Sequence, residues 1–221
     1  MFGFPMSTIT EKGAYIIMRP FTPDEIAQIA KLISSYHVAR TLKLGSAQTA
    51  QQEMEWFEGI SASTDSVHWA ICWANDAHDT VGVPIGTSAL TNIKLNRATS
   101  GIVIFDKSAW QQGIATAAHR ARCHYAHHVM GLNAIDSGAL RGNVGSIRSL
   151  CKVGYVHTGV EYGAYLRQGQ PIHHELLLWV NPTERNWNYF WGDNGFPKKF
   201  IGGRRRAQSA LNWANEHVTF L

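Results

Sequence analysis

The chain has 221 residues, a length that suits one domain with some additional chain. Hydrophobic residues make up 45% of it and charged residues only 16%, a composition that excludes an intrinsically disordered or coiled-coil protein. The formal net charge of +4 permits an anionic partner without requiring one.

The three cysteines, Cys72, Cys123 and Cys151, are odd in number and far apart in the sequence. They therefore predict neither a disulfide framework nor a four-cysteine zinc site. The first residues lack the pattern of a signal peptide, and no apolar run approaches the roughly 20 residues that span a bilayer. We expect a cytoplasmic protein without membrane association.

Strands and helices are expected to alternate irregularly as far as Val180. The residue patterns predict strands at 15–20, 68–74, 84–93, 101–105 and 133–140, two more between 155 and 180, and helices at 22–33, 47–58, 114–130 and 144–152. This alternation predicts a single mixed α/β sheet domain.

Two of these predictions rest on particularly clear local signals. Thr22-Pro23-Asp24-Glu25 has the spacing of a capping box, with proline at the first helical position. Gly101-Ile102-Val103-Ile104-Phe105 is a short, unbroken apolar run, which is typical of a buried central strand.

The composition changes after Val180. Residues 181–221 hold six basic and three acidic side chains, together with eight of the 24 aromatic residues. So many aromatic residues argue against a loose tail. We therefore divide the chain into a domain at 1–180 and a basic, aromatic extension at 181–221, which we expect to fold back onto the domain or to form an interface.

Two motifs point to a ligand. In the first, the strand at 101–105 leads into Gln111-Gln112-Gly113-Ile114-Ala115-Thr116 and then into a long helix. Small residues at such a turn let the backbone approach a ligand, and the N-terminus of a helix offers unpaired N–H groups to a pyrophosphate. Alone, this motif is equally consistent with a tight turn. The second motif lies about 30 residues downstream and runs from Asn143 through Ser146 and Ile147 to Gly154-Tyr155.

Together, the two motifs resemble those of the GNAT superfamily of N-acetyltransferases. With Trp110 before the first motif and Asn143, Ser146 and Ile147 in the second, the chain is most similar to the branch that acetylates the N-terminal amines of ribosomal proteins. The resemblance covers residues 15–180. It implies a mixed, mostly antiparallel central sheet flanked by helices, and acetyl-CoA as co-substrate with no metal.

The resemblance also implies which residues bind acetyl-CoA. The backbone at Val103, Ile104 and Phe105 would pair with the pantetheine, and Asn143 would hold the pantetheine arm. The pyrophosphate would lie in the loop formed by Gln111, Gln112, Gly113, Ile114, Ala115 and Thr116.

The implied reaction is direct transfer, which needs a base for the amine and an acid for the leaving thiolate. Many family members have a tyrosine acid where this chain has Leu150. Relatives in the branch that this chain resembles are similar to it at that position, and the resemblance implies that the helix serine, here Ser146, is the acid. A glutamate base is often found on the central strand of relatives, but residues 97–101 contain none.

Five other side chains remain as possible bases: Glu161, Glu175, His173, His174 and His68. Alternation along a strand places His173 and Glu175 on one face and His174 on the other. A carboxylate beside an imidazole raises its basicity, so His173 with Glu175 is the pair that the sequence favours.

Other histidine patterns do not predict a metal site. His119, His124, His127 and His128 lie on one predicted helix, where we expect partly exposed surface side chains. His173-His174-Glu175 begins like a zinc-protease motif, but Leu178 stands where the second histidine is needed.

The sequence thus predicts an acetyl-CoA-dependent N-acetyltransferase, a monomer or homodimer, that acts on the primary amine of a small molecule or of a protein N-terminus. Two alternatives stay open. Gly202-Gly203-Arg204-Arg205-Arg206 and the nearby aromatic residues fit a nucleic-acid-associated module. The missing glutamate and tyrosine fit a non-catalytic binder of acyl-CoA.

Overall fold

A computed structural model describes residues 1–42 and 47–221. Within these residues nine strands form one sheet, in the order β7-β8-β6-β5-β4-β3-β2-β1-β9. The strands are β1 (Met6–Ile9), β2 (Tyr15–Arg19), β3 (Val67–Ala74), β4 (Val83–Lys94), β5 (Arg97–Ile104), β6 (Ala134–Leu140), β7 (Val156–Arg167), β8 (Gln170–Val180) and β9 (Thr219–Phe220).

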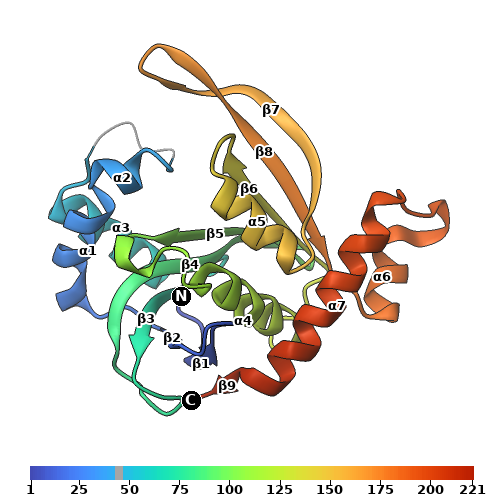
Figure 1. The fold of residues 1–221 in the computed structure, drawn as a ribbon, viewed down its shortest axis with the longest axis horizontal. Helices are drawn as coiled ribbons and strands as arrows, with labels where there is room; N and C mark the ends of the chain where they lie inside the picture. The colour runs from blue at the N-terminus through green and yellow to red at the C-terminus, as the bar shows by residue number, and fades with distance from the viewer. Residues whose placement is uncertain (43–46) are drawn as a thin grey trace.

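Helices cover both faces of this sheet (Figure 1). The helices are α1 (Ile26–Ile33), α2 (Tyr36–Ala39), α3 (Ala50–Ala62), α4 (Ile114–His128), α5 (Val144–Lys152), α6 (Glu184–Trp191) and α7 (Lys199–His217), with short 3-10 turns at Pro23–Glu25, Lys107–Ala109 and Gly192–Asn194. Beyond its pairing with β6, the long hairpin of β7 and β8 arches over the molecule in Figure 1. Near its turn, Arg167 Nη2 donates to the Leu42 carbonyl at 3.1 Å. In the part of the chain that the structure describes, no helix is long and apolar enough to cross a membrane.

The predicted mixed α/β fold is confirmed, including each predicted strand and long helix. The capping box at Thr22 is present, with Glu25 accepting the Thr22 N–H at 2.9 Å, although the first turn is 3-10 and α1 begins at Ile26. Sequence patterns missed β1 and β9, which pair with each other at Met6–Phe220 and extend the sheet beyond β2.

Strands β5 and β6 are the parallel pair in an otherwise antiparallel sheet. Their register covers only three positions, from Arg97 opposite Ala134 to Thr99 opposite Asp136. Beyond these residues β5 continues to pair with β4, and β6 continues to pair with β8. The sheet therefore opens between β5 and β6 after Thr99, and this splayed gap lies between the two motifs that the sequence analysis identified.

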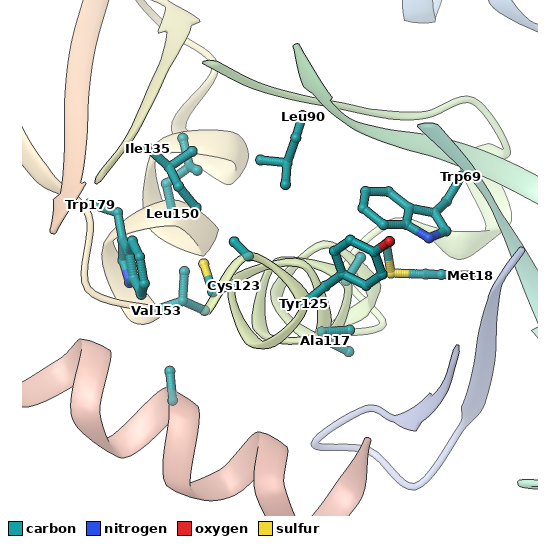
Figure 2. Close-up of a cluster of buried hydrophobic side chains, with 14 of the residues drawn as sticks. Met18, Trp69, Leu90, Ala117, Cys123, Tyr125, Ile135, Leu150, Val153 and Trp179 are labelled. Carbon is teal, nitrogen blue, oxygen red and sulfur yellow. The ribbon is translucent and has the colours of Figure 1, made fainter. Parts of the chain in front are cut away.

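The main core packs α4 against the sheet. Figure 2 shows this helix between Ile135 and Trp179 on one side and Trp69 and Met18 on the other. On the opposite face of the sheet, α1 and α3 cover a second apolar cluster that includes Phe105. Side chains of β5 thus alternate between two cores, which explains why its sequence is a continuous apolar run.

The segment at 181–221 packs onto the domain. Helix α7 contributes Ala207, Ala210 and Leu211 to the main core. Helix α6 buries Trp187 in a third apolar cluster with Leu178 and Val180, on the other face of β8. Two basic side chains of the segment bond to the domain as well: Arg206 Nε donates to the Cys151 carbonyl and Lys199 Nζ to the His157 carbonyl. Arg204 Nε donates to the Pro182 carbonyl, within the segment itself. Packing of α6 and α7 accounts for much of the aromatic and basic composition of this segment.

Candidate functional site

One wall of the gap is the backbone of β5. On its β4 side, the Phe105 N–H donates to the Ile85 carbonyl at 2.9 Å. On its β6 side, the Ser100 carbonyl accepts from Ser137 Oγ at 3.5 Å. Alternate residues of a strand direct their N–H and C=O groups to the same side. The Ile102 N–H therefore faces the gap, on the same side as the Ser100 carbonyl.

This alternation separates the three predicted pantetheine-binding residues. Ile104 directs its N–H and carbonyl toward the gap, where the carbonyl accepts from Trp110 Nε1 at 2.9 Å. Val103 and Phe105 face β4 instead. Ile102, which the sequence analysis did not include, shares the orientation of Ile104.

The other wall of the gap is β6, where Gly138 lies opposite the 101–102 peptide unit. Extending the β5–β6 register by two residues brings Gly138 level with Gly101. The imidazole of His174, on β8, covers Gly138: a Cβ built on Gly138 would lie 2.5 Å from His174 Cε1. The backbone N–H of Ile102 and the ring of His174 thus border the gap at the same level.

His174 is buried, and two side chains of β7 lie around it. Its Nδ1 lies 3.4 Å from a carboxylate oxygen of Glu161, and the Tyr165 ring meets the imidazole edge-on at 5.9 Å between centroids. Glu161 is exposed. A carboxylate at Nδ1 orients an imidazole and stabilises its protonated form, as a general base requires.

The Gln111–Thr116 loop ends in a helix N-terminus whose geometry suits an anion. Gln111 and Gly113 adopt left-handed backbone conformations, with φ of 63° and 83°. The first bond of α4 runs from the Ala117 N–H to the Gly113 carbonyl, and no side chain caps the helix at Gly113. The N–H groups of Ile114, Ala115 and Thr116 precede that bond, so they are available to a phosphate. The residues present therefore fit the pyrophosphate that the sequence predicts here.

Two salt bridges join the turn between β1 and β2 to helices α4 and α5. Glu11 accepts from Arg120 Nη2 of α4 at 2.8 Å and from Lys152 Nζ of α5 at 3.1 Å. The hydrogen bond from Lys152 is the largest cause that lowers the pKa of Glu11. Lys12, the next residue, reaches Gln112 Oε1 at 3.5 Å.

Helix α5 begins at the predicted cap. Asn143 Oδ1 accepts from the Ser146 N–H at 3.3 Å, which fixes the amide side chain at the start of the helix. Ser146 is half-buried on the first turn. Within residues 1–42 and 47–221, its hydroxyl has no hydrogen-bond partner. Leu150, where many relatives have tyrosine, is buried in the main core.

The carboxylate of Glu175 lies beside an imidazole, but that imidazole belongs to His157 and not to the predicted His173. Glu175 also accepts from Arg141 Nε at 2.5 Å, and this bond is the largest cause that lowers its pKa. His173 lies apart, with its Nδ1 accepting from the Gly163 N–H at 3.0 Å. His173 and Glu175 are two residues apart on β8 and share a face. The imidazole nearest to the Glu175 carboxylate nevertheless comes from His157, on the neighbouring strand β7.

Three histidines, two on α4 and one on β3, do not lie where their predicted roles would place them. His119 and His124 are buried, not partly exposed, because α4 is covered by the sheet on one side and by α7 on another. His68, a candidate base, is buried on β3 with its ring against Trp56. Strand β4 separates it from the gap. No cluster of three or more potential metal-binding side chains is present among residues 1–42 and 47–221.

Comparison with known proteins agrees with this geometry. The acetyltransferase (GNAT) domain family matches residues 16–156, which is more than half of the chain. The chain therefore belongs to the GNAT family of N-acetyltransferases, whose fold has been described above.

Two curated relatives come from Bacillus subtilis strain 168. The probable N-acetyltransferase YjcK is 30% identical over 102 residues, 45% of this chain and 56% of the relative, so the chain spans little more than half of that protein. The uncharacterised N-acetyltransferase YoaA is 25% identical over 172 residues, 76% of this chain and 95% of the relative.

Solved structures share the fold at low identity. Mycobacterium smegmatis RimJ in complex with CoA-disulfide has a TM-score of 0.68 at 16% identity, over 93% of this chain and 94% of that chain. Spermidine N-acetyltransferase from Vibrio cholerae, in complex with CoA and spermine, has a TM-score of 0.67 at 13% identity, over 75% of this chain and 95% of that chain.

Proposed function

We propose that this protein transfers the acetyl group of acetyl-CoA directly to a primary amine in the gap between β5 and β6. One observation carries the proposal: an outward-facing backbone N–H at Ile102 and the imidazole of His174 over Gly138 border that gap at the same level. A donor for the carbonyl oxygen and a base for the amine are the two groups that aminolysis of a thioester needs.

Residues on the α4 side would hold the co-substrate. The loop of Gln111, Gln112 and Gly113 with the first turn of α4 would hold the pyrophosphate, and Ile104 would pair with the pantetheine. Asn143, which caps α5, would hold the pantetheine arm from the other side. Bound in this way, the co-substrate supplies an acetyl thioester at the level of Ile102.

Acetyl transfer begins at the amine. His174 Nε2 takes a proton from the ammonium group, either directly or through water. The amine nitrogen then donates its lone pair to the thioester carbonyl carbon, and a C–N bond forms. Negative charge develops on the carbonyl oxygen, where the Ile102 N–H stabilises it. The C–S bond breaks as the carbonyl reforms, and the nitrogen loses its second proton to water, which leaves a neutral amide. The leaving sulfur takes a proton from the Ser146 hydroxyl, which regains one from water.

The acceptor would be the primary amine of a small molecule or of a peptide N-terminus. His174 lies on the face of the sheet opposite α4, together with Leu178 and Val180. An amine would enter from this face, between the α1–α3 side and the β7–β8 strands, while the co-substrate occupies the side of α4. The two substrates can then reach the gap without displacing each other.

A thiol-release assay tests the proposal. The purified chain is given acetyl-CoA with spermidine or with a peptide that has a free N-terminal amine, and a peptide of the same sequence with a blocked N-terminus is the control. We expect thiol release that depends on the free amine, and a product heavier by one acetyl group. Absence of CoA binding at millimolar concentration in calorimetry contradicts the proposal. Binding without turnover on any amine supports the non-catalytic binder instead.

A further inference from the structure

A fully buried arginine lies beneath β5. Arg122, on α4, has no exposed surface, and its Nη1 donates to the Gly101 carbonyl at 2.8 Å and to Ser88 Oγ at 3.1 Å. Its Nη2 lies 2.7 Å from His119 Nδ1. Because a guanidinium only donates, His119 Nδ1 must accept, so the proton of that imidazole resides on Nε2.

No anion balances this charge among residues 1–42 and 47–221. The nearest ionisable groups are neutral: burial raises the pKa of the Cys123 thiol to about 11 and also raises the pKa of Tyr155. Burial, with the neighbouring Arg122 charge, holds the pKa of His119 well below its ordinary value. Arg122 Nε has no hydrogen-bond partner in the described part of the chain. An unpaired buried cation costs several kcal/mol, so a contribution to stability does not explain it.

The contact with Gly101 connects Arg122 to the gap. The Gly101 carbonyl and the Ile102 N–H belong to one planar, trans peptide unit, so they point in opposite directions. The carbonyl points to Arg122 on the β4 side, and the N–H therefore points to β6. A cation at the carbonyl oxygen draws electron density through the peptide and makes its N–H a stronger donor.

We propose that Arg122 is a positioning residue for acetyl transfer, which fixes and polarises the 101–102 peptide so that the Ile102 N–H binds the carbonyl oxygen of the thioester. This inference rests on the proposed function. The stabilising effect of Arg122 grows during acetyl transfer, because negative charge accumulates on the thioester carbonyl oxygen as the C–N bond forms. His119 holds the guanidinium in place, and its neutral state leaves the positive charge of Arg122 directed at Gly101.

The test uses the full chain and Arg122→Gln, with a readout that does not need turnover. Infrared difference spectra of bound acetyl-CoA labelled with ¹³C at the carbonyl report how strongly that carbonyl is hydrogen-bonded. In the wild-type chain we expect the band to lie at a lower frequency than in free acetyl-CoA. Arg122→Gln should reduce this shift and lower kcat about 10- to 100-fold. The Kd of CoA, which lacks the acetyl group and its carbonyl, should change less than threefold.

Arg19→Gln is the matched control, because Arg19 is also a buried arginine but pairs with Glu25, away from the gap. It should lower the Tm without changing kcat or the carbonyl band. Should Arg122→Gln fail to fold, Arg122→Lys keeps the charge with a shorter reach, and we expect an intermediate band position. An unchanged carbonyl band in either folded Arg122 variant overturns the inference. A wild-type chain that does not bind acetyl-CoA overturns the proposed function instead.

Discussion

The imidazole of His174 lies against Gly138 so closely that residue 138 has room for no side chain. A Cβ there would lie 2.5 Å from His174 Cε1 and 2.8 Å from the Glu175 carbonyl oxygen. Gly138→Ala should therefore displace the imidazole from the gap, and we expect kcat to fall at least 10-fold. The Kd of CoA, measured by calorimetry, should stay within about threefold, because the α4 loop is not touched.

Gly159→Ala provides the control for this substitution. Gly159 is also a half-buried strand glycine, but a Cβ there meets nothing within 4 Å. Its kcat should match that of the wild-type chain. Equal losses of kcat in the two variants would show that strand perturbation, and not the position of His174, is responsible.

Substitution of His174 and substitution of Glu161 should lower kcat/KM by different amounts. We expect His174→Gln to lower kcat/KM by about 10²- to 10⁴-fold, the range for loss of a general base. Glu161→Gln should cause a smaller loss, because the exposed carboxylate lies 3.4 Å from the imidazole and acts through it. Steady-state kinetics across pH separate the two effects. A larger loss for His173→Gln or Glu175→Gln than for His174→Gln would return the role of base to the pair that the sequence favours.

The left-handed conformation at Gly113 gives a test of the pyrophosphate loop. Gly113→Ala places a side chain at φ of 83°, and we expect strain of about 1 kcal/mol and a Kd of CoA raised about 10-fold. Gly131→Ala, near the other end of α4 at φ of 62°, imposes similar strain away from the loop. It should lower the Tm comparably but leave the Kd of CoA unchanged. If both variants bind CoA equally, the loop does not hold the pyrophosphate.

Acid should destabilise the fold before carboxylates titrate. Burial lowers the pKa of His68 to about 4, from an ordinary value of 6.5. Between these pH values the unfolded chain binds a proton that the folded chain does not, so stability falls as pH decreases from 6.5 to 4. His68 alone accounts for up to about 3 kcal/mol. Urea unfolding across this range measures the slope, which His68→Gln should reduce and the exposed His78→Gln should leave unchanged.

Removal of residues 181–221 should unfold the protein. A chain that ends at Val180 lacks Ala207, Ala210 and Leu211 of the main core, and we expect near-UV circular dichroism to show loss of tertiary structure. A folded, stable chain that ends at Val180 would contradict this expectation.

A nucleic-acid role is better tested by charge reversal at the exposed Arg185 and Arg205. This double variant should keep its Tm. If it abolishes a salt-dependent RNA binding that the wild-type chain shows, the result would support that role.

Local sequence signals were sufficient for the elements that carry the co-substrate loop. The apolar run at 101–105, the turn at Gly113 and the cap at Asn143 each identify an element without reference to the rest of the chain. In contrast, β1 and β9 are short, and their pairing joins Met6 to Phe220, which no local pattern reveals.

The site residues were harder to predict because they depend on which strands are neighbours. Alternation correctly separates His174 from His173 and Glu175, but only the place of β8 beside β6 shows that His174 borders the gap. Arg122 and His119 lie outside the apolar stripe of α4 on a helical wheel. They are buried because other elements cover that side of the helix.

The pairing of β1 with β9 has a consequence for how the chain folds. Hydrogen bonding at this edge joins residues that are more than 200 positions apart, and α7 must dock before they meet. Contacts of such long sequence separation form late and slowly. Until then the outer edge of β1 offers unpaired N–H and C=O groups to other chains. We expect refolding yield to fall with protein concentration, and the completion of this edge to be the kinetic step that protects the protein from aggregation.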